Sequence, residues 1–215
     1  MIERDGLRFI VPAALASLLC WLLVYATHSY MGMVLALLAT ACTGFVIYFF
    51  RDPDRTPPAG ENSILSPGDG KVIVVEERTF ADGTTYNLVS IFLSVFDVHV
   101  NRIPISGTVK RVEYIPGRFH RAYEPQAVSE NERAEITIAS RCGDVRFSQV
   151  AGILARRVVC RVREGDTVTR GARCGLIRFG SRVDLFLDHR VHLEVKIGDR
   201  VAGGVSVIGR FPQDG

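Results

Sequence analysis

Twice in its last third the chain reads Gly-Asp-x-Val-x-x-Gly, as GDTVTRG at residues 165–171 and as GDRVAGG at residues 198–204. A Gly-Asp pair between short apolar runs is typical of a tight turn between two strands, and the later glycine marks a second bend. Two copies of one turn pattern indicate an internal repeat. We therefore expect a small, mostly antiparallel β domain with pseudo-symmetry.

The chain around these turns also favours strands. Runs rich in β-branched residues recur between glycines, and several alternate apolar with polar residues as half-buried strands do; they lie at residues 72–75, 89–93, 136–138 and 191–195. Only residues 151–159 favour a short helix. The turn pattern resembles that of biotinyl/lipoyl-type domains, which implies a mainly β, barrel-sandwich-like domain over residues 59–215. Such barrels host carriers, peptidases and decarboxylases, so the fold alone assigns no function.

Two apolar segments without charge, residues 9–27 and 31–50, precede this domain. Each is about as long as the roughly 20 residues that a helix needs to cross the hydrocarbon core. Arginines lie only at the outer ends of the pair, and by the positive-inside rule both ends then face the cytoplasm. The proline-rich stretch 51–58 ends the helical pattern. We expect residues 1–58 to form a membrane-anchoring helical hairpin and its linker.

Two other arrangements of these segments stay open. Pro12 could kink the first helix, which is compatible with a shallow hairpin that does not span the membrane. A buried helical hairpin of a soluble protein is the second. A secretory signal is disfavoured, because another apolar segment follows at once and no small-residue cleavage site is evident.

The composition excludes several classes of protein. Of the 215 residues, 47% are hydrophobic and 23% are charged, which is incompatible with a disordered chain. A net charge of +3 without a recognisable binding module argues against nucleic acid. The five cysteines form no CxxC pair, and the histidines show no metal-ligand spacing, so we expect no metal. None of the three lysines has the context of a pyridoxal phosphate site.

Between the two Gly-Asp turns lies the dipeptide Gly180-Ser181. Glycine adopts backbone conformations closed to other residues, so such a bond can be strained in a turn. If the hydroxyl of Ser181 faces the carbonyl of Gly180, it can attack and shift the acyl group from nitrogen to oxygen. β-Elimination of that ester leaves dehydroalanine, which hydrolyses to a pyruvoyl group and ammonia. Most Gly-Ser pairs are ordinary turns, so the dipeptide alone carries little weight.

Two upstream stretches supply the partners that self-cleavage needs. Asp69 lies in a glycine turn before a strand, in SPGDGKV at residues 66–72, where turn chemistry alone would explain it. His99 ends an apolar strand in FDVHVNR at residues 96–102. A lone histidine is more often structural than catalytic. Together, however, an aspartate, a histidine and a serine provide the orienting group, base and nucleophile of a self-cleaving site.

In order and spacing, the chain resembles the phosphatidylserine decarboxylase family in its short prokaryotic, archaeal-type, pyruvoyl-dependent form. The matching stretches are YFFRDP at 48–53, SPGDG at 66–70, DVHVNR at 97–102, PGRF at 116–119 with NER at 131–133, and IRFGSR at 177–182. The resemblance implies a proenzyme cut between Gly180 and Ser181. The products would be a β chain (1–180) and an α chain (181–215) that form a heterodimer, with Ser181 converted to pyruvic acid.

The resemblance also implies the activity. Phosphatidylserine in the membrane would be decarboxylated to phosphatidylethanolamine with release of CO2, as a step of phospholipid biosynthesis. The covalent pyruvoyl group derived from Ser181 would replace pyridoxal as the electron sink. The enzyme would lie at the cell membrane with its catalytic domain on the cytoplasmic face. Homo-oligomers are compatible with this reading.

Site residues follow from the same resemblance. Asp69 matches the family's acidic residue in self-processing, and His99 matches its histidine. Longer members carry a second histidine three residues later, where this chain has Arg102. Either His99 performs both base and acid duties, or another residue such as His120, in the loop-like stretch 117–121, takes the second.

The remaining polar residues are less specific. A further departure is Asp188-His189-Arg190, where a Leu-Pro turn is usual, and we expect His189 and His192 to be structural or exposed. Guanidinium groups suit phosphate and carboxylate, but no single arginine is assigned to the substrate; the candidates are Arg118, Arg121, Arg133 and Arg178.

Two other functions compete with decarboxylation. A biotinyl or lipoyl carrier needs a modifiable lysine at a hairpin tip, typically beside a methionine, and neither Lys71 nor Lys196 has that context. A membrane-tethered homologue that never processes is the other reading, and electrophoresis of the purified chain distinguishes it.

Overall fold

The computed structural model describes residues 1–79, 83–121, 123–124, 127–152, 158–177 and 181–212. Contacts within the chain divide it into two compact units, Met1–Asp54 and Arg55–Gly215. Each unit has its own secondary structure, helical in the first and mainly β in the second.

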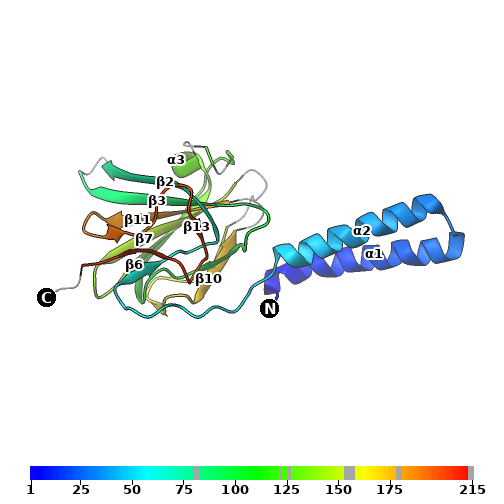
Figure 1. Cartoon of the computed structure of the whole chain (residues 1–215), viewed down its shortest axis with the longest axis horizontal. Helices are drawn as coiled ribbons and strands as arrows, with labels where there is room; N and C mark the ends of the chain where they lie inside the picture. The colour runs from blue at the N-terminus through cyan, green and yellow to red at the C-terminus, as the bar shows by residue number, and fades with distance from the viewer. Residues whose placement is uncertain (80–82, 122, 125–126, 153–157, 178–180, 213–215) are drawn as a thin grey trace. The chain divides into compact units, whose positions relative to one another are not determined.

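The first unit is a helical hairpin (Figure 1). A 3-10 turn at Arg4–Gly6 leads into α1 (Leu7–Thr27), and α2 (Tyr30–Phe49) follows after two residues. His28 takes a left-handed conformation with φ of 51°, and the Ser29 hydroxyl accepts the Gly32 N–H, so the turn ends one helix and caps the next. Both helices are long and apolar enough to cross a membrane, which confirms the expected hairpin and suggests membrane association.

A small polar cluster joins the two helices in the middle of their apolar sequence. The Thr40 hydroxyl donates to the Ala36 carbonyl at 2.8 Å and accepts the indole N–H of Trp21 at 3.0 Å. The hydroxyls of Ser17 and Thr40 are 2.9 Å apart. In lipid such groups must be satisfied within the protein, and this cluster satisfies them between the helices.

Over its described residues, the second unit contains fifteen short elements. They are β1 (Ser63–Leu65), β2 (Gly70–Thr79), β3 (Thr85–Leu93), β4 (Val100–Arg102), β5 (Gly107–Ile115), α3 (Ala127–Glu130), β6 (Arg133–Ala139), β7 (Asp144–Val150), β8 (Val158–Cys160), β9 (Thr167–Val168), β10 (Arg173–Ile177), β11 (Ser181–Asp188), β12 (His192–Leu193), β13 (Arg200–Val201) and β14 (Val207–Arg210). A curled antiparallel sheet has the order β13-β2-β3-β11-β7-β6-β5-β9. Two three-stranded sheets, β1-β14-β12 and β4-β10-β8, complete the unit.

The mainly β prediction is confirmed, with one local error. The runs at 72–75, 89–93 and 136–138 lie in β2, β3 and β6, whereas only two residues of the run at 191–195 form a strand. The expected helix at 151–159 falls largely outside the described residues. Val158 and Val159 were assigned wrongly, because they lie in β8 and pair with β10. β-Branched residues suit a strand.

The two Gly-Asp turns are equivalent in detail, as the repeat predicted. Gly165 and Gly198 have φ of 88° and 100°, values open mainly to glycine. Val109 exchanges backbone hydrogen bonds with the first turn, donating to Asp166 and accepting from Gly165. Val72 does the same with Asp199 and Gly198 of the second turn. The ladder β5–β9 therefore corresponds to β2–β13.

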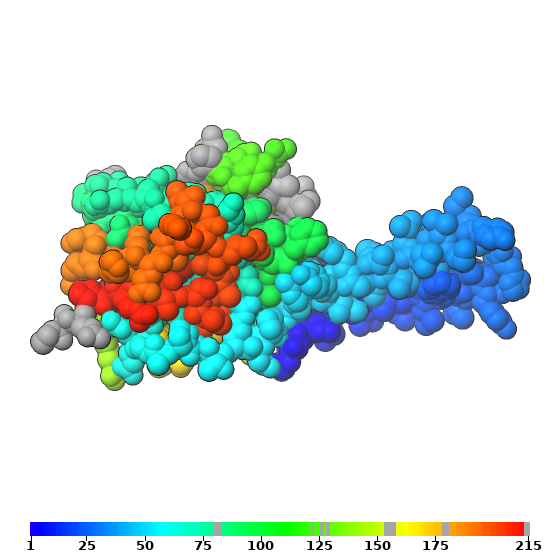
Figure 2. Space-filling model, in the orientation of Figure 1, coloured from blue at the N-terminus to red at the C-terminus, as the bar shows by residue number. Residues whose placement is uncertain are grey.

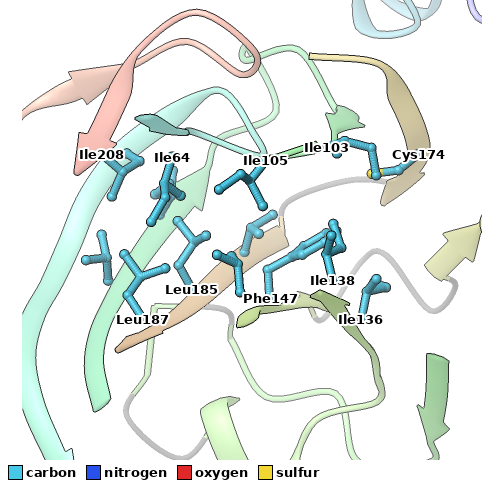
Figure 3. Packing of buried hydrophobic residues seen from close by; sticks show 14 of the residues in the cluster. Ile64, Ile103, Ile105, Ile136, Ile138, Phe147, Cys174, Leu185, Leu187 and Ile208 are labelled. Atoms are coloured by element: carbon cyan, nitrogen blue, oxygen red, sulfur yellow. The ribbon is translucent and has the colours of Figure 1, made fainter. Parts of the chain in front are cut away.

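The core of the second unit lies on one face of the curled sheet (Figure 3). Alternate residues of β11, Val183, Leu185 and Leu187, are fully buried there. Phe147 of β7 and Ile136 of β6 continue the same layer. Each such side chain contributes roughly 1.5–3 kcal/mol by burial, so the core holds β11 firmly in the centre of the sheet.

Candidate active site

Ser181 is the first residue of β11 and lies opposite Leu93 of β3. The residue is completely buried, and its Oγ has no hydrogen-bond partner within the part of the chain that the structure describes. A buried hydroxyl without a partner costs free energy and calls for an explanation, such as a reactive role. β11 pairs with β3 on one side and β7 on the other, so the backbone on the C-terminal side of Ser181 is held in place.

The other half of the expected cleavage site, Gly180, lies outside the described residues, as does Arg178. The chain leaves the described part after Ile177, the last residue of β10, and returns at Ser181. The backbone N–H of Ile177 donates to the carbonyl of His99 at 3.3 Å. The segment that contains the expected cleavage point therefore starts beside His99 and ends at Ser181.

His99 is buried, with 1% of its surface exposed. Its Nδ1 is 2.9 Å from the carbonyl oxygen of Asp97. A carbonyl only accepts, so Nδ1 carries a proton, and in the neutral ring Nε2 carries the lone pair. That tautomer suits a general base.

Asp97 holds the turn on which His99 depends, although the sequence pattern assigned it no role. Its carboxylate accepts the backbone N–H and the hydroxyl of Ser94, at 2.9 and 2.7 Å, and pairs with Arg200 at 2.6 Å. These bonds fix the backbone carbonyl that orients the imidazole of His99. Asp97 is thus a positioning residue.

Asp69, the acidic residue expected to act in self-processing, contacts Arg55 and Gly203. Its carboxylate binds the guanidinium of Arg55 through both oxygens, at 2.5 and 2.7 Å, and accepts the N–H of Gly203 at 2.8 Å. Among the described residues, no hydrogen bond joins it to His99 or Ser181. The turn is nevertheless close to the nucleophile. A Cβ on Gly68 would lie 3.4 Å from the side chains of Leu93, which pairs with Ser181, and Val183, which lies two residues after it.

The internal repeat explains part of this arrangement. Ser106 holds the position in the first half-repeat that Asp69 holds in the second, and its hydroxyl accepts the N–H of Arg170 at 3.0 Å, as Asp69 accepts that of Gly203. An acceptor at this position therefore closes a turn in both copies. The ion pair with Arg55 is an addition found only at Asp69.

We expect Arg55→Ala to lower the free energy of unfolding by about 2 kcal/mol, because it strands a largely buried carboxylate. The two side chains are 12% and 16% exposed. Urea unfolding followed by circular dichroism measures the change. Arg210→Ala is the matched control, since its pair with Glu194 is 41% and 34% exposed and should contribute under about 1 kcal/mol. Equal effects of the two substitutions would contradict a special role for the Arg55–Asp69 pair.

Arg102, which occupies the place of the family's second histidine, has a structural role. It is buried, and its Nη1 donates to the carbonyl of Gly171 at 2.9 Å. Its Cδ packs so closely on Gly204 that a Cβ there would approach to 2.6 Å. The side chain thus joins the ends of the two repeats.

His120 is brought toward the Ser181 end of the sheet by Asn131. The Asn131 side chain accepts the N–H of His120 at 2.8 Å and donates to the carbonyls of His120 and Ala151 at 2.9 and 2.7 Å. Ala151 directly follows Val150, which pairs with the residue after Ser181. In the sequence analysis Asn131 appears only as part of the NER motif, without a role of its own. The His120 ring is 3.1 Å from Glu130.

The candidate arginines separate into two groups. Arg133 is committed to Glu135 at 2.8 Å. The Arg118 side chain is 76% exposed and makes a loose ion pair with Glu130 at 3.6 Å. Arg121 is exposed and donates a hydrogen bond to the Tyr123 hydroxyl. These last two are accessible to an anion. His189 and His192 are exposed, as predicted.

A buried amide pair lies on the core side of the sheet near Ser181. Gln149 donates to the side-chain carbonyl of Asn101 at 2.8 Å, and both residues are completely buried. Gln149 faces Val183 across β7 and β11. Its own carbonyl oxygen has no partner among the described residues. No periodicity or motif singles out Gln149, because one polar residue in a buried strand has no local signature.

The cysteines nearby are unsuited to nucleophilic chemistry. Burial raises the pKa of the Cys174 thiol, and the adjacent Cys160 adds to the rise. Burial also raises the pKa of Cys160. Over the described ranges, no group of three or more histidine, cysteine or acidic residues could hold a metal ion.

Brief treatment of the folded protein with iodoacetamide near pH 7.5 should therefore label the half-buried Cys142 before Cys160 or Cys174. A raised pKa leaves less thiolate at that pH, and the thiolate is the reacting form. Peptide mapping by mass spectrometry measures the labelling. Early modification of Cys174 would be incompatible with its burial.

Known proteins match the chain over most of its length. The family model described as phosphatidylserine decarboxylase matches residues 42–209. A phosphatidylserine decarboxylase proenzyme of Desulfotalea psychrophila is 42% identical over 98% of this chain and 96% of the relative's. Proenzymes of the same name from Magnetococcus marinus and Chlorobium chlorochromatii are 44% and 48% identical, over 94% and 78% of this chain and 90% and 79% of theirs. The extent of these matches shows that the chain belongs to the phosphatidylserine decarboxylase family.

Proposed function

We propose that this chain is a proenzyme that cleaves itself between Gly180 and Ser181 and then decarboxylates phosphatidylserine to phosphatidylethanolamine. The observation that carries the proposal is the buried hydroxyl of Ser181 at the start of the central strand, which has no hydrogen-bond partner among the described residues. Family membership supports the substrate, and the relatives are named proenzymes.

In the cleavage step, His99 is the base. Its Nε2 removes the proton from Ser181 Oγ, and the oxygen attacks the carbonyl carbon of Gly180. The acyl group moves from nitrogen to oxygen, and β-elimination then breaks the ester and releases the Gly180 carboxylate. Hydrolysis of the remaining dehydroalanine consumes one water and releases ammonia. Asp69 acts indirectly, because its pair with Arg55 and its bond to Gly203 hold the turn that packs beside Ser181.

The two products, a β chain of residues 1–180 and an α chain of residues 181–215, remain a heterodimer. β11 of the α chain lies between β3 and β7 of the β chain, while β13 pairs with β2 and β14 with β1. Figure 2 shows the orange and red α-chain residues packed among the cyan and green residues of the β chain. No strand pairing is lost when one peptide bond is cut.

Position 181 fits a covalent pyruvoyl group. Ser181 is completely buried and its Oγ has no partner over the described ranges, which marks an enclosed position at the end of a rigid strand. When formed, the group supplies the electron sink for loss of CO2, without pyridoxal phosphate or metal. The chain's own residues bind and protonate: Arg118 and Arg121 offer guanidinium groups to the headgroup phosphate or carboxylate. His99 returns a proton to the substrate's α-carbon, with His120 as the second candidate.

The finer assignments rest on family likeness and charge pattern. We place the enzyme in the short, archaeal-type subfamily, with a biotinyl/lipoyl-like barrel-sandwich in its second unit. Arginines at the outer ends of the two apolar helices favour a catalytic unit on the cytoplasmic face of the cell membrane. Homo-oligomers remain compatible with this arrangement.

Intact mass and activity test the proposed function together. Purified protein should yield two chains, with the α chain lighter by one ammonia than a chain that begins with serine. The same sample should release CO2 from phosphatidylserine in mixed micelles. A single chain of 23.7 kDa under maturation conditions, without CO2 release, would favour the unprocessed homologue instead.

A further inference from the structure

Three of the five large apolar side chains that the second unit exposes, over its described residues, gather near the end of the sheet where β11 begins. They are Phe96, Tyr123 and Ile197, with exposed fractions of 63%, 54% and 62%. Single exposed apolar residues are normal on a protein surface. A group of three near a candidate active site is more specific.

These side chains lie on three loops tied to one row of the sheet. In that row Arg200 of β13, Lys71 of β2 and Phe92 of β3 face one another across adjacent strands. Phe96 precedes Asp97, which pairs with Arg200 at 2.6 Å, and the ring of Tyr123 contacts Phe92 edge-on at 6.1 Å.

Ile197 belongs to the turn that begins the same β13 strand. Gly198 and Asp199 of this turn exchange backbone hydrogen bonds with Val72 of β2. Ile197 therefore lies on the same corner of the sheet as Arg200 and Lys71.

The apolar side chains are accompanied by cations. Lys71 and Lys196 are exposed, and the Arg200 side chain is 68% exposed. Lys71 has no ion-pair partner among the described residues. We call Lys71, Phe96, Tyr123, Lys196, Ile197 and Arg200 the aromatic–basic rim. Aromatic and aliphatic groups flanked by lysine and arginine suit a membrane interface, where rings reach the acyl boundary and cations meet anionic headgroups.

The rim borders the candidate active site. Phe92, in the row that carries the rim, pairs with Arg182, the residue after Ser181. Phe96 is followed by Asp97, whose carbonyl orients His99. A ligand that crosses the rim therefore arrives beside the base and the nucleophile.

We propose that the aromatic–basic rim is a membrane-docking surface of the second unit, which inserts into the headgroup layer of a bilayer that contains anionic lipid. This contact is additional to the N-terminal hairpin. The inference rests on the proposed function: a phospholipid with long acyl chains stays in the bilayer, so only its headgroup reaches Ser181, and the site must open at the membrane surface. The positive rim complements the negative surface that phosphatidylserine creates.

A comparison of two substrate forms tests the rim with the full-length, processed enzyme. The triple variant Phe96→Ser, Tyr123→Ser, Ile197→Ser should lose about tenfold or more of its kcat/KM on vesicles of phosphatidylserine and phosphatidylcholine. On dihexanoyl phosphatidylserine below its critical micelle concentration, the same variant should stay within about twofold of wild type, because no docking is needed.

Tyr114→Ser is the matched control. Tyr114 is the same residue type as Tyr123, with 56% exposure, but it lies on β5, four strands from β3 in the order of the sheet. It should behave as wild type on both substrates. The proposal would be overturned if the triple variant lost the same share of its activity on vesicles and on monomers. It would also be overturned if the variant kept its full activity on both.

The charges allow a second test. Raising the salt concentration should reduce the activity of the wild type on anionic vesicles, since screening weakens the attraction of exposed cations. The double variant Lys71→Gln, Lys196→Gln should show a shallower salt dependence. Identical salt profiles would count against the rim.

The depth to which Phe96 enters the bilayer can be measured directly. Phe96→Trp in a Trp21→Phe background carries a single tryptophan, because Trp21 is the only one in the chain. Its fluorescence should be quenched by lipids brominated near the headgroup, and absence of quenching would contradict insertion. Failure of the proposed function can be told apart from failure of the docking proposal. If the wild type showed no activity on monomeric phosphatidylserine, which needs no docking, the proposed function itself would be wrong.

Discussion

The variant Ser181→Ala is expected to remain a single chain of 23.7 kDa and to release no CO2 from phosphatidylserine. It lacks the hydroxyl that attacks Gly180, so neither the ester nor the dehydroalanine that precedes the pyruvoyl group can form. The fold should survive, because the lost Oγ makes no hydrogen bond within the described structure. Denaturing electrophoresis and a CO2-release assay measure the two effects.

Ser148→Ala is the matched control for that experiment. Ser148 is also buried in a neighbouring strand, β7, and its Oγ likewise has no partner over the described residues. It faces Asp184, in the interior of β11, instead of the start of the strand. Ser148→Ala should process and decarboxylate normally. Decarboxylation by Ser181→Ala would refute the proposed mechanism.

His99→Ala is expected to slow self-cleavage, decarboxylation or both by about 100-fold or more, the typical contribution of a general base. The imidazole is buried and the Asp97 carbonyl holds its Nδ1, so the substitution removes a base with a fixed orientation. Time courses of chain cleavage, and rates of CO2 release after normalisation to cleaved enzyme, separate the two steps.

His189→Ala provides the comparison, since the His189 side chain is 68% exposed at a turn beyond β11. It should match wild type in both assays. Normal cleavage and normal decarboxylation by His99→Ala would remove His99 from the site. A defect confined to decarboxylation would instead assign the cleavage base elsewhere, with His120 the next candidate.

Local patterns in the sequence were enough to predict the helical hairpin and three of the long strands, β2, β3 and β6. Two charge-free runs of about 20 residues leave a helix as the structure that satisfies its own backbone in an apolar setting. β-Branched runs at 72–75 and 89–93 likewise match β2 and β3. The helix expected at 151–159 failed at Val158 and Val159, because these β-branched residues pair with β10 as part of β8.

The roles of polar residues were harder to predict, since they depend on partners distant in the chain. Asp69 was predicted as a residue of self-processing, and its contacts turned out to be with Arg55, at the start of the second unit, and Gly203, near its end. Asn131 and Gln149 stabilise the surroundings of Ser181 through Ala151 and Asn101. Motif spacing carries no information about such pairs, because sheet closure decides which side chains meet.

By itself, the sequence determined the repeated Gly-Asp turns, the apolar hairpin and the Ser181 and His99 candidates, because each is a local pattern of residue type and spacing. Only the tertiary structure decided that Arg102 joins the two repeats through Gly171, and that Asp69 forms an ion pair with Arg55. It also decided that the hydroxyl of Ser181 is buried and has no hydrogen-bond partner in the part of the chain that the structure describes. The physical reason is the same in each case: burial and hydrogen-bond satisfaction are properties of strands brought together from distant parts of the chain.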